Sequence, residues 1–559
     1  MSPTTNEWLD GQGEEKQLAD EERQTPNSQR QNAIKEYVYG PGLGTQVYQP
    51  TIQPRNYCDN DNCDERTDLV KPGQRAIIKF EMELEGGSKI LQFVAATAAN
   101  LCILASGAMM GWTSPVLSYM SKNSTEPVDP ENPLGYNITS EENSWVGSIM
   151  TIGAVVGSLI SGYLGERFGR KKALLFSAVP YLIGWILVAT TKSLEQLYAA
   201  RFIFGVALAI DFTIVPMYCG EIAETSIRGV LGSFLQLFVT VGLLFSYCIG
   251  PYVSYTVFWI ACGSLPIIFF VCFMFMPESP YYLLAQGMKD DAAESLAKLR
   301  GKNVGAVQKE LGEMQTAVDQ AFSTEVKMSD LFTVKSNFKA LLYTCAAVSF
   351  QQLTGINVVL FYTQDIFKSA GTSLDPAICT ILVGAVQLAA SGVTPVIVDR
   401  LGRRTLLIIS GIGTSITTGS LGVYFYLQSE KNAEGLGWLP VASLIVFVSL
   451  YCIGWGPLPW AIMGEMFSSE VKAKASGITV LICWAFAFVI TKYFSTISNA
   501  YGNHTAFWIF TVFCILSIVF ALMLLPETRG KSLKQIQSEL SGTEYQDEDE
   551  ELGEPTAKM

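Results

Sequence analysis

The chain has 559 residues, of which 49% are hydrophobic and only 16% are charged, and its net charge is −13. Soluble domains carry about 25% charged residues, so this composition indicates that lipid replaces water around much of the chain. The acidic balance argues against a nucleic-acid partner, which would need a basic face. Because the chain has a single histidine, His504, we expect neither histidine-based catalysis nor a metal site, and no cofactor.

The first segment, residues 1–88, is polar and contains no long apolar run. It is rich in Gln, Asn, Glu and Pro, a composition typical of disordered regions. No apolar stretch follows Met1, so we expect no cleavable signal peptide. We interpret the segment as a disordered cytosolic tail.

Apolar segments long enough to cross a bilayer then recur along the chain. Because a membrane-spanning segment must satisfy its own backbone hydrogen bonds, each is expected to be a helix. The expected spans are residues 92–119, 143–164, 173–191, 196–219, 230–250, 255–276, 338–363, 376–398, 404–427, 439–463, 474–494 and 505–525.

These spans predict an all-α membrane protein with twelve transmembrane helices. The predicted parts are an N-terminal half (89–276), a helical cytosolic linker (277–337), a C-terminal half (338–525) and an acidic cytosolic tail (526–559).

Short motifs recur in the two halves in the same order. GERFGRK at 165 matches VDRLGRR at 398, GEIAETSIRG at 220 matches GEMFSSEVKA at 464, and PESP at 277 matches PETR at 526. Three ordered matches at similar spacing indicate two copies of one six-helix unit. In proteins built this way, the binding site lies near the middle of the membrane between the halves, which rock to expose it to each side in turn.

The positive charge of the short loops predicts which side of the membrane they occupy. Loops 165–172 and 399–404 are strongly basic, and twelve spans place them on the same side as both tails. We therefore expect that side to face the cytosol, and we expect the protein to lie in the cell membrane. The N-glycosylation sequons at Asn123, Asn137 and Asn503 fall on the opposite side. Asn503 is expected to stay unmodified because it lies so close to the membrane.

Charged residues cluster at the predicted cytosolic helix ends of both halves. Opposite charges on the two halves can pair only while that side is closed, so they would stabilise the outward-open state and separate when the protein opens inward. The alternative is interfacial charge that serves topology alone. This predicted charge latch comprises Arg167, Arg170, Glu221, Arg228, Glu278, Asp399, Arg403, Arg404, Glu465, Lys472 and Glu527.

Seven motifs in order resemble those of the sugar porter family of the major facilitator superfamily: GERFGRKK, PMYCGEIAETSIRG, PESP, QQLTGIN, DRLGRR, GWGPLPW and PETRGKSL. The resemblance runs from about residue 91 to residue 537. GWTSP in the first span and the style of GPLPWAIMGEMFSSEVKAKASG are similar to insect facilitative trehalose and hexose transporters. The resemblance implies the major facilitator fold and a sugar transporter that works by alternating access, not an enzyme.

The candidate sugar-binding residues are uncharged and polar, and amides suit a neutral sugar because they both donate and accept hydrogen bonds. Gln351, Gln352 and Asn357 lie in one otherwise apolar span. In an unbroken helix, Gln352 and Asn357 would point about 140° apart. Gly355 between them permits a break that would let both face the centre. The alternative is that these amides only bond neighbouring helices.

The resemblance also implies roles for residues elsewhere in the chain. Gln236 of the fifth span would bind sugar hydroxyls together with the three amides. Trp460 and Trp484 would contact the apolar face of the sugar, or else serve as packing aromatics. Phe361 and Tyr362 match an aromatic pair that forms an outer gate.

Four positions depart from the family pattern. Gln387, a further candidate sugar-binding residue, stands where a shorter Asn is usual. Cys483 replaces an Asn, and Cys452 replaces a Glu of many animal hexose carriers. Lys472 replaces an Arg and cannot form its bidentate fork with a carboxylate. Sugar transport should survive these changes, but the preferred sugar need not be the usual one.

The fourth span bears on proton coupling. Proton-coupled relatives carry an Asp in the first helix near an Arg of the fourth helix. In this chain, Ala108 occupies the first-helix position, and the fourth-helix Arg is retained as Arg201. This favours a uniporter. Asp211 is the alternative proton site, because a carboxylate at the centre of a membrane costs ~2.5–3.5 kcal/mol and is a functional candidate by default. Asp211 is ten residues from Arg201, about 15 Å along a helix, so the two cannot pair directly.

The leading interpretation is facilitated diffusion of a hexose or trehalose, with a small neutral sugar and the lipid bilayer as the partners. The alternatives are a proton-coupled sugar symporter that uses Asp211, a non-transporting sugar receptor that signals through its tails, and a carrier of a polyol. The identity of the sugar and the oligomeric state are left open by the sequence.

Overall fold

The computed structural model describes residues 87–542 apart from 121–126, 324–327, 373, 468–470, 530 and 532. Nearly all of the segment interpreted as a disordered tail, and the acidic stretch after residue 542, therefore lie outside the described residues. Every regular element within the described residues is a helix, which confirms the all-α fold class.

Twelve helical segments of the described chain are long and apolar enough to cross a membrane, as the sequence predicted. The first six are continuous helices, and some of them contain a proline. They are α3 (Ile90–Met120), α4 (Ser140–Phe168), α5 (Arg170–Ala189), α6 (Leu194–Ile222), α7 (Arg228–Ile249) and α8 (Tyr255–Phe273).

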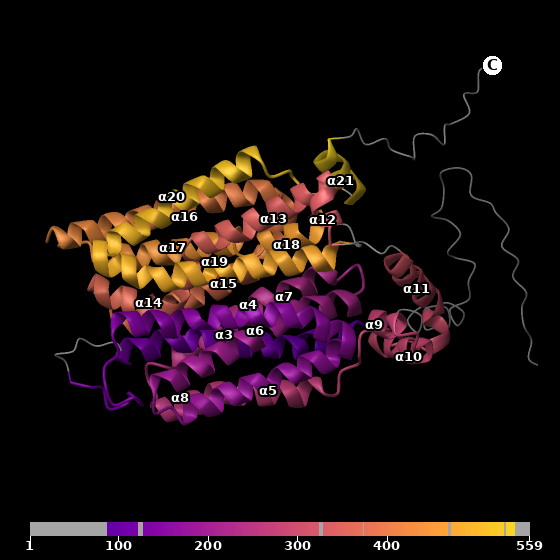
Figure 1. The fold of residues 1–559 in the computed structure, drawn as a ribbon, viewed down its shortest axis with the longest axis horizontal. Coiled ribbons are helices and arrows are strands. Elements are labelled where there is room, and N and C mark those ends of the chain that lie inside the picture. The colour runs from indigo at the N-terminus through magenta and orange to yellow at the C-terminus, as the bar shows by residue number, and fades with distance from the viewer. Residues whose placement is uncertain are drawn as a thin grey trace, which may run out of the picture. The chain divides into compact units, whose positions relative to one another are not determined.

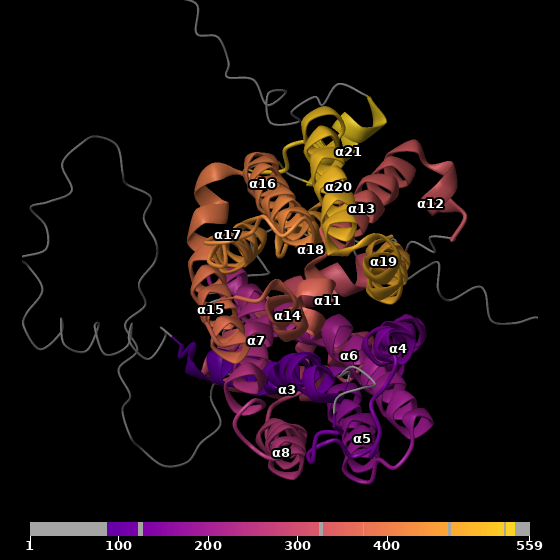
Figure 2. The same cartoon turned by 90° about the vertical axis from the view of Figure 1, so that its left-hand side faces the viewer.

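In the second half, the seventh and tenth spans are each built from two consecutive helices. The elements are α13 (Lys335–Leu353) and α14 (Ile356–Ala370), α15 (Pro376–Leu401), α16 (Arg403–Ser429), α17 (Leu439–Ile453) and α18 (Leu458–Met466), α19 (Lys472–Tyr501) and α20 (Asn503–Met523). Figure 2 shows the helices α3 to α8 gathered on one side and α16 to α20 on the other.

The segment between the halves is helical. It forms α9 (Pro280–Ala285), α10 (Lys289–Arg300), the 3-10 helix η2 (Val304–Val307), α11 (Gln308–Ser323) and α12 (Asp330–Thr333). The helices α9, α10 and α11 share a small apolar core of their own, which includes Leu296 and Met314. The acidic tail also begins with structure, because α21 (Leu533–Ser541) packs against α13 and α18.

The two ends of the bundle differ in what they carry. The helices α9 to α11 lie at one end (Figure 1), which we call the linker end. The opposite end, which we call the distal end, holds the loops around residues 190–193, 250–254 and 430–438. The halves meet mainly where α4 packs against α19, α7 against α15 and α3 against α14.

Small residues let helices within a half approach closely. Gly107 of α3 and Gly242 of α7 face backbone atoms of the opposing helix so closely that a methyl group at either position would overlap them. Gly153 of α4 and Gly205 of α6 form a second close contact of the same kind. Such contacts are typical of membrane helices, which associate through close packing because lipid supplies no hydrophobic drive between them. They make the N-terminal half one tightly packed unit.

Candidate functional site

The break expected in the seventh span is present. α13 ends at Leu353 and α14 begins at Ile356, with Gly355 between them at a φ of +85°. The side chains of Gln352 and Asn357 meet across this break, where Asn357 Nδ2 donates to Gln352 Oε1 at 2.6 Å. A Cβ atom at Gly355 would lie 2.6 Å from the ring of Phe510. Glycine therefore satisfies both the backbone angle and the packing at this point.

The two glutamines extend this contact into a chain of amides. Gln352 Nε2 donates to Gln351 Oε1 at 3.3 Å and to Cys483 Sγ at 3.1 Å. Gln351 Nε2 donates to the carbonyl oxygens of Trp455 and Gly456, at 2.9 and 2.6 Å. These carbonyls lie where the tenth span is interrupted between α17 and α18. The amide chain Asn357–Gln352–Gln351 thus joins the two helix breaks of the C-terminal half.

Two other predicted residues are buried with polar atoms that lack a partner within the described residues. Gln387 of α15 is 2% exposed and its Oε1 accepts no hydrogen bond, and Trp484 of α19 is 5% exposed with an unpaired Nε1. Buried polar groups are normally satisfied, so these two atoms are available to a ligand or a water molecule. The Trp484 ring also packs edge-on against Phe212 of α6, with centroids 6.2 Å apart, and so touches the opposite half.

The remaining predicted sugar-binding residues are less buried. Gln236 lies on α7 and Trp460 on α18, and both side chains are partly buried. The structure gives neither side chain a hydrogen bond to the amide chain within the described residues. Cys452, which stands where a Glu is common, is fully buried, and its carbonyl accepts from Thr394 Oγ1 at 3.0 Å.

The predicted gate residues are buried at the distal side of the amide chain. Phe361 is fully buried, and Tyr362 is 3% exposed at a kink in α14 where its φ and ψ are −120° and 17°. Tyr362 stacks on Phe494 of α19, with ring centroids 5.9 Å apart, and its hydroxyl lies against Gly147 of the other half. Tyr247 of α7 donates to the carbonyl of Leu360 at 2.8 Å. These contacts tie α14 to the N-terminal half, so this conformation is closed at the distal side.

Asp211 lies inside the N-terminal half. It is fully buried, and Ser106 of α3 donates to its Oδ2 at 3.3 Å while also bonding the hydroxyl of Tyr181 of α5 at 2.6 Å. Arg201 is a separate site: its Nε donates to the Val146 carbonyl at 3.1 Å and its guanidinium lies 6.0 Å from the Phe361 ring centroid. The expectation that Asp211 and Arg201 do not pair agrees with this arrangement.

The repeated charge motifs fold into two similar clusters at the linker end, which we call charge cages. In the N-terminal cage, Arg170 Nη2 pairs with Glu221 at 2.8 Å, and Glu221 also accepts a short hydrogen bond from Ser279 Oγ. Glu278 accepts from the backbone N–H groups of Arg170 and Lys171 at 3.1 and 3.0 Å. All five residues belong to the N-terminal half or to the start of the linker.

The C-terminal cage repeats this geometry. Arg403 Nη2 pairs with Glu465 at 3.0 Å, and Thr528 Oγ1 donates to the same carboxylate at 2.6 Å. Glu527 accepts from the backbone N–H groups of Arg403 and Arg404, both at 3.0 Å. The internal repeat in the sequence is therefore also a repeat of hydrogen bonding.

These ion pairs join helices within one half, whereas the charge latch was expected to link the halves. Across the halves, Arg228 of α7 and Lys472 of α19 are both cations and repel each other, and Lys472 Nζ donates to the Gly464 carbonyl at 2.9 Å. Arg167 contributes its carbonyl, which accepts from Tyr282. The side chain of Asp399 lies outside the described residues. Pairing across the halves therefore stays a prediction for a state closed at the linker end.

Two of the predicted glycosylation sites fall at the distal end. Asn137 precedes α4 and is partly buried, and Asn503 begins α20. Asn503 Oδ1 accepts a hydrogen bond from Ser498 Oγ. Asn123 lies outside the described residues.

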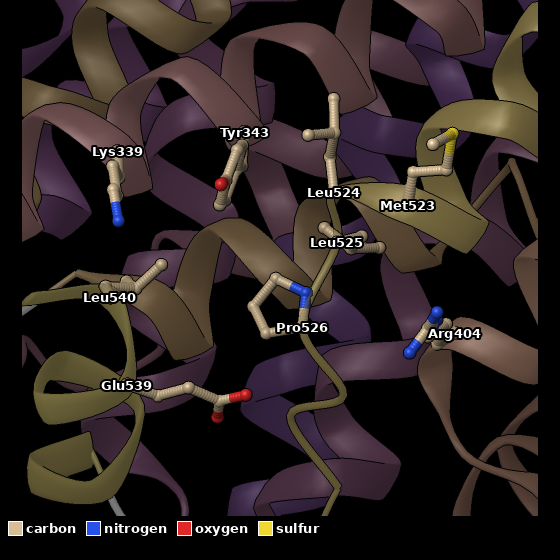
Figure 3. Close-up of a pocket in the computed structure, with 9 residues that line it drawn as sticks. All are labelled: Lys339, Tyr343, Arg404, Met523, Leu524, Leu525, Pro526, Glu539 and Leu540. Carbon is tan, nitrogen blue, oxygen red and sulfur yellow. The ribbon is translucent and has the colours of Figure 1, made fainter. Parts of the chain in front are cut away.

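A cavity of about 270 Å³ lies elsewhere, between α13, α20 and α21 at the linker end (Figure 3). Lys339, Tyr343 and Leu540 line it together with Met523 and Pro526. None of the predicted sugar-binding residues lines it, so its position does not bear on the amide chain.

Sequence reasoning missed the acceptors of the amide chain. It named Gln351 and Gln352 but not the carbonyls of Trp455 and Gly456, or Cys483 as an acceptor. The GWGPLP segment (454–459) indicated that the carbonyls of Trp455 and Gly456 would be free, because Gly and Pro together interrupt a helix and leave its carbonyls without helical partners.

The structure defines a class of protein: a membrane transporter with two repeated six-helix halves, interrupted helices and an uncharged polar cluster. The family model described as "Sugar (and other) transporter" matches residues 99–540, so the chain belongs to this family and is a sugar transporter with the major facilitator fold.

Similar proteins agree with this assignment. The chain is 34% identical over 453 residues to the "Facilitated trehalose transporter Tret1" of Culex quinquefasciatus, a match that covers 81% of this chain and 86% of that protein. It is 34% identical over 454 residues to the protein of the same name in Bombyx mori, covering 80% and 87%. A solved structure of the proton:xylose symporter XylE bound to 6-bromo-6-deoxy-D-glucose matches with a TM-score of 0.66 at 26% identity, covering 80% and 99%. These relatives are transporters, in line with the expectation that the chain is not an enzyme.

The two charge cages differ in the direction in which they shift the pKa of the carboxylate that accepts backbone N–H groups. Burial raises the pKa of Glu278, and the N–H groups of Ser279 and Lys171 only partly offset it. Burial also raises the pKa of Glu527, but the N–H groups of Arg529, Arg403 and Arg404 outweigh it and leave the pKa below its ordinary value. The charged form of Glu527 is therefore the one that stabilises the C-terminal cage.

We expect Glu527→Gln to lower the free energy of unfolding at pH 7 by about 1 kcal/mol, because charge-assisted hydrogen bonds are lost from a partly exposed site. Because the pKa of Glu527 is lowered in the folded protein, its ionised carboxylate adds to the free energy of unfolding. This contribution is complete at pH values above the ordinary pKa of 4.5 and is lost as the pH falls below 4.5. The difference from the wild type should therefore shrink below that pH. Thermal unfolding of the purified protein measures it, with Glu434→Gln in an exposed loop as the control. Equal stability of wild type and Glu527→Gln at pH 7 would contradict this role.

Proposed function

We propose that the protein carries a small neutral sugar, a hexose or trehalose, across the cell membrane by facilitated diffusion. The observation that carries this proposal is the buried amide chain Asn357–Gln352–Gln351 at the break of the seventh span. Its groups both donate and accept, as the hydroxyl groups of a sugar do. The names of the insect relatives support trehalose as one substrate.

In this proposal, the sugar replaces bonds that the site makes with itself. A sugar hydroxyl would take the place of the 2.6 Å contact between Asn357 and Gln352, and others would reach the unpaired atoms of Gln387 and Trp484. The helix breaks near Gly355 and Gly456 give α14 and α18 room to bend as the halves rock. Phe361 and Tyr362 would close the distal side over the bound sugar.

We expect Gln352→Ala and Asn357→Ala each to weaken sugar transport about two- to tenfold, because each removes a hydrogen bond worth roughly 0.5–1.5 kcal/mol. Radiolabelled uptake into proteoliposomes, with glucose, fructose, trehalose and inositol compared, measures the effect and the substrate class. Gln308→Ala on the exposed start of α11 is a matched control, because that amide donates to the nearby Val304 carbonyl and lies far from the amide chain. Normal kinetics in both site variants would remove the seventh span from the site.

We also propose that the linker end and both tails face the cytosol. The basic loops and the charge cages lie at the linker end, which supports this orientation by the positive-inside rule. The expected outcome is a glycan on Asn123 or Asn137, so glycosidase treatment should increase gel mobility and the double variant Asn123→Gln/Asn137→Gln should abolish that shift. Unchanged mobility, together with cleavage of residues near 30 by protease added outside, would reverse the orientation.

The mechanism that we favour is uniport without proton coupling. Ala108 occupies the first-helix position where a titrating Asp would lie, and Asp211 is bonded inside one half by Ser106. Uptake should therefore equilibrate sugar without accumulating it, and an imposed proton gradient should change the plateau little. The alternative is proton symport, since the structurally similar XylE is a proton:xylose symporter. Uphill accumulation under an inward proton gradient, abolished by Asp211→Asn, would establish symport instead.

A further inference from the structure

A lysine lies inside the eleventh span and is covered by the opposite half. The side chain of Lys492 is only 11% exposed. It is nine residues before the end of α19 at Tyr501, about 13 Å along the helix. Its partner Glu141 is 80% exposed in the first turn of α4, so Lys492 lies near the aqueous boundary, where a lysine would ordinarily extend its ammonium group into water. Sugar binding and the charge cages do not use this residue.

The partners that the structure gives Lys492 all belong to α4. Its Nζ donates to Ser144 Oγ at 2.8 Å, lies 4.3 Å from the centroid of the Trp145 ring, and lies 4.0 Å from Oε1 of Glu141. Residues 141, 144 and 145 are spaced so that they share one face of α4. The ammonium group therefore rests on a site built by a single helix of the N-terminal half.

Neighbouring contacts continue the same seam. The rings of Trp145 and Phe488 pack with centroids 6.1 Å apart, and Ser495 Oγ donates to the Ser140 carbonyl at 3.2 Å. Residues 488, 492 and 495 follow the i, i+4, i+7 spacing of one helix face. The seam lies toward the distal end, next to Phe494, which stacks on the gate residue Tyr362. Opening the distal side must pull α4 away from α19 and break these contacts.

We propose that Lys492 is a cation clamp that holds the distal side closed and releases α4 each time the carrier opens there. In the closed state, the Trp145 ring and the Ser144 hydroxyl replace part of the water around the ammonium group. In the open state, water takes their place. Loss of the clamp should favour the distal-open state by about tenfold, within the range that a desolvated cation–π contact supports. The inference rests on the alternating-access cycle of the proposed function, but on neither the sugar nor the orientation.

Hydrogen–deuterium exchange of the purified full-length protein in lipid nanodiscs tests the clamp. Lys492→Met keeps a long apolar side chain but removes the charge. It should speed exchange about tenfold in peptides that cover 140–150 and 486–496, with no change in 280–320. Lys492→Arg, which retains a cation and donors, should behave as the wild type. Lys192→Met removes a positive charge from the same end but outside the seam, and should also leave exchange unchanged.

Variants on α4 examine the clamp from its other side. Ser144→Ala and Trp145→Leu should each speed exchange in the same two segments, and Lys492→Met added to Trp145→Leu should add little, because both remove one interaction. Unchanged exchange in Lys492→Met would overturn the proposal. If Lys492→Met does not fold, unchanged exchange in both α4 variants would overturn it instead. The exchange measurement requires no sugar. If the wild-type protein showed no sugar flux, the proposed function would be wrong, and the exchange data would still decide whether Lys492 acts as a clamp.

Discussion

A helix that is interrupted inside a membrane frees backbone carbonyls that lipid cannot solvate, so the protein must supply their partners. Here, the tenth span is interrupted after Ile453, and the Gln351 side chain donates to the carbonyls of Trp455 and Gly456. Gln351 is held in turn by Gln352, and Gln352 by Asn357 beyond the second interruption. One chain of amides thus satisfies the backbone of one break and spans the other. The same polar groups that keep the fold intact are the ones suited to a polyhydroxyl ligand.

Away from these breaks, each half is held together by contacts of its own. Close glycine contacts hold α3 against α7 and α4 against α6. At the linker end, each half has its own charge cage, which fixes neighbouring helix ends by an Arg–Glu pair and by a carboxylate that accepts backbone N–H groups. Because the cages act within each half, they can remain intact while the halves move. Movement of the halves would then be concentrated where they meet, at the predicted gate residues of α14 and along the contacts of α4 with α19.

The sequence predicted the features that depend on local pattern. Twelve apolar runs predicted twelve spans, ordered motifs predicted the repeat, and Gly355 predicted a break that brings Gln352 and Asn357 together. Partner choice was harder to predict, because charges placed at one side of the membrane could pair within a half or between halves. Arg170 with Glu221 shows that within-half pairing occurs. Asp211 was identifiable as an unusual residue, but its enclosure by α3 and α5 depends on helix rotation, which an almost uniformly apolar span does not reveal. The contacts of Lys492 were hard to predict for another reason: its partners are about 350 residues away along the chain.

The amide chain has a consequence for how tightly such a carrier can hold its cargo. In this structure, Asn357 Nδ2 donates a hydrogen bond to Gln352 Oε1 at 2.6 Å. An incoming hydroxyl therefore exchanges one hydrogen bond for another, and the net gain per contact is small. If these amides bind sugar as we propose, the site should bind with modest affinity and release its cargo quickly. For a passive carrier this is an advantage, since flux down a gradient is limited by release as much as by capture, and an abundant sugar keeps a weak site occupied.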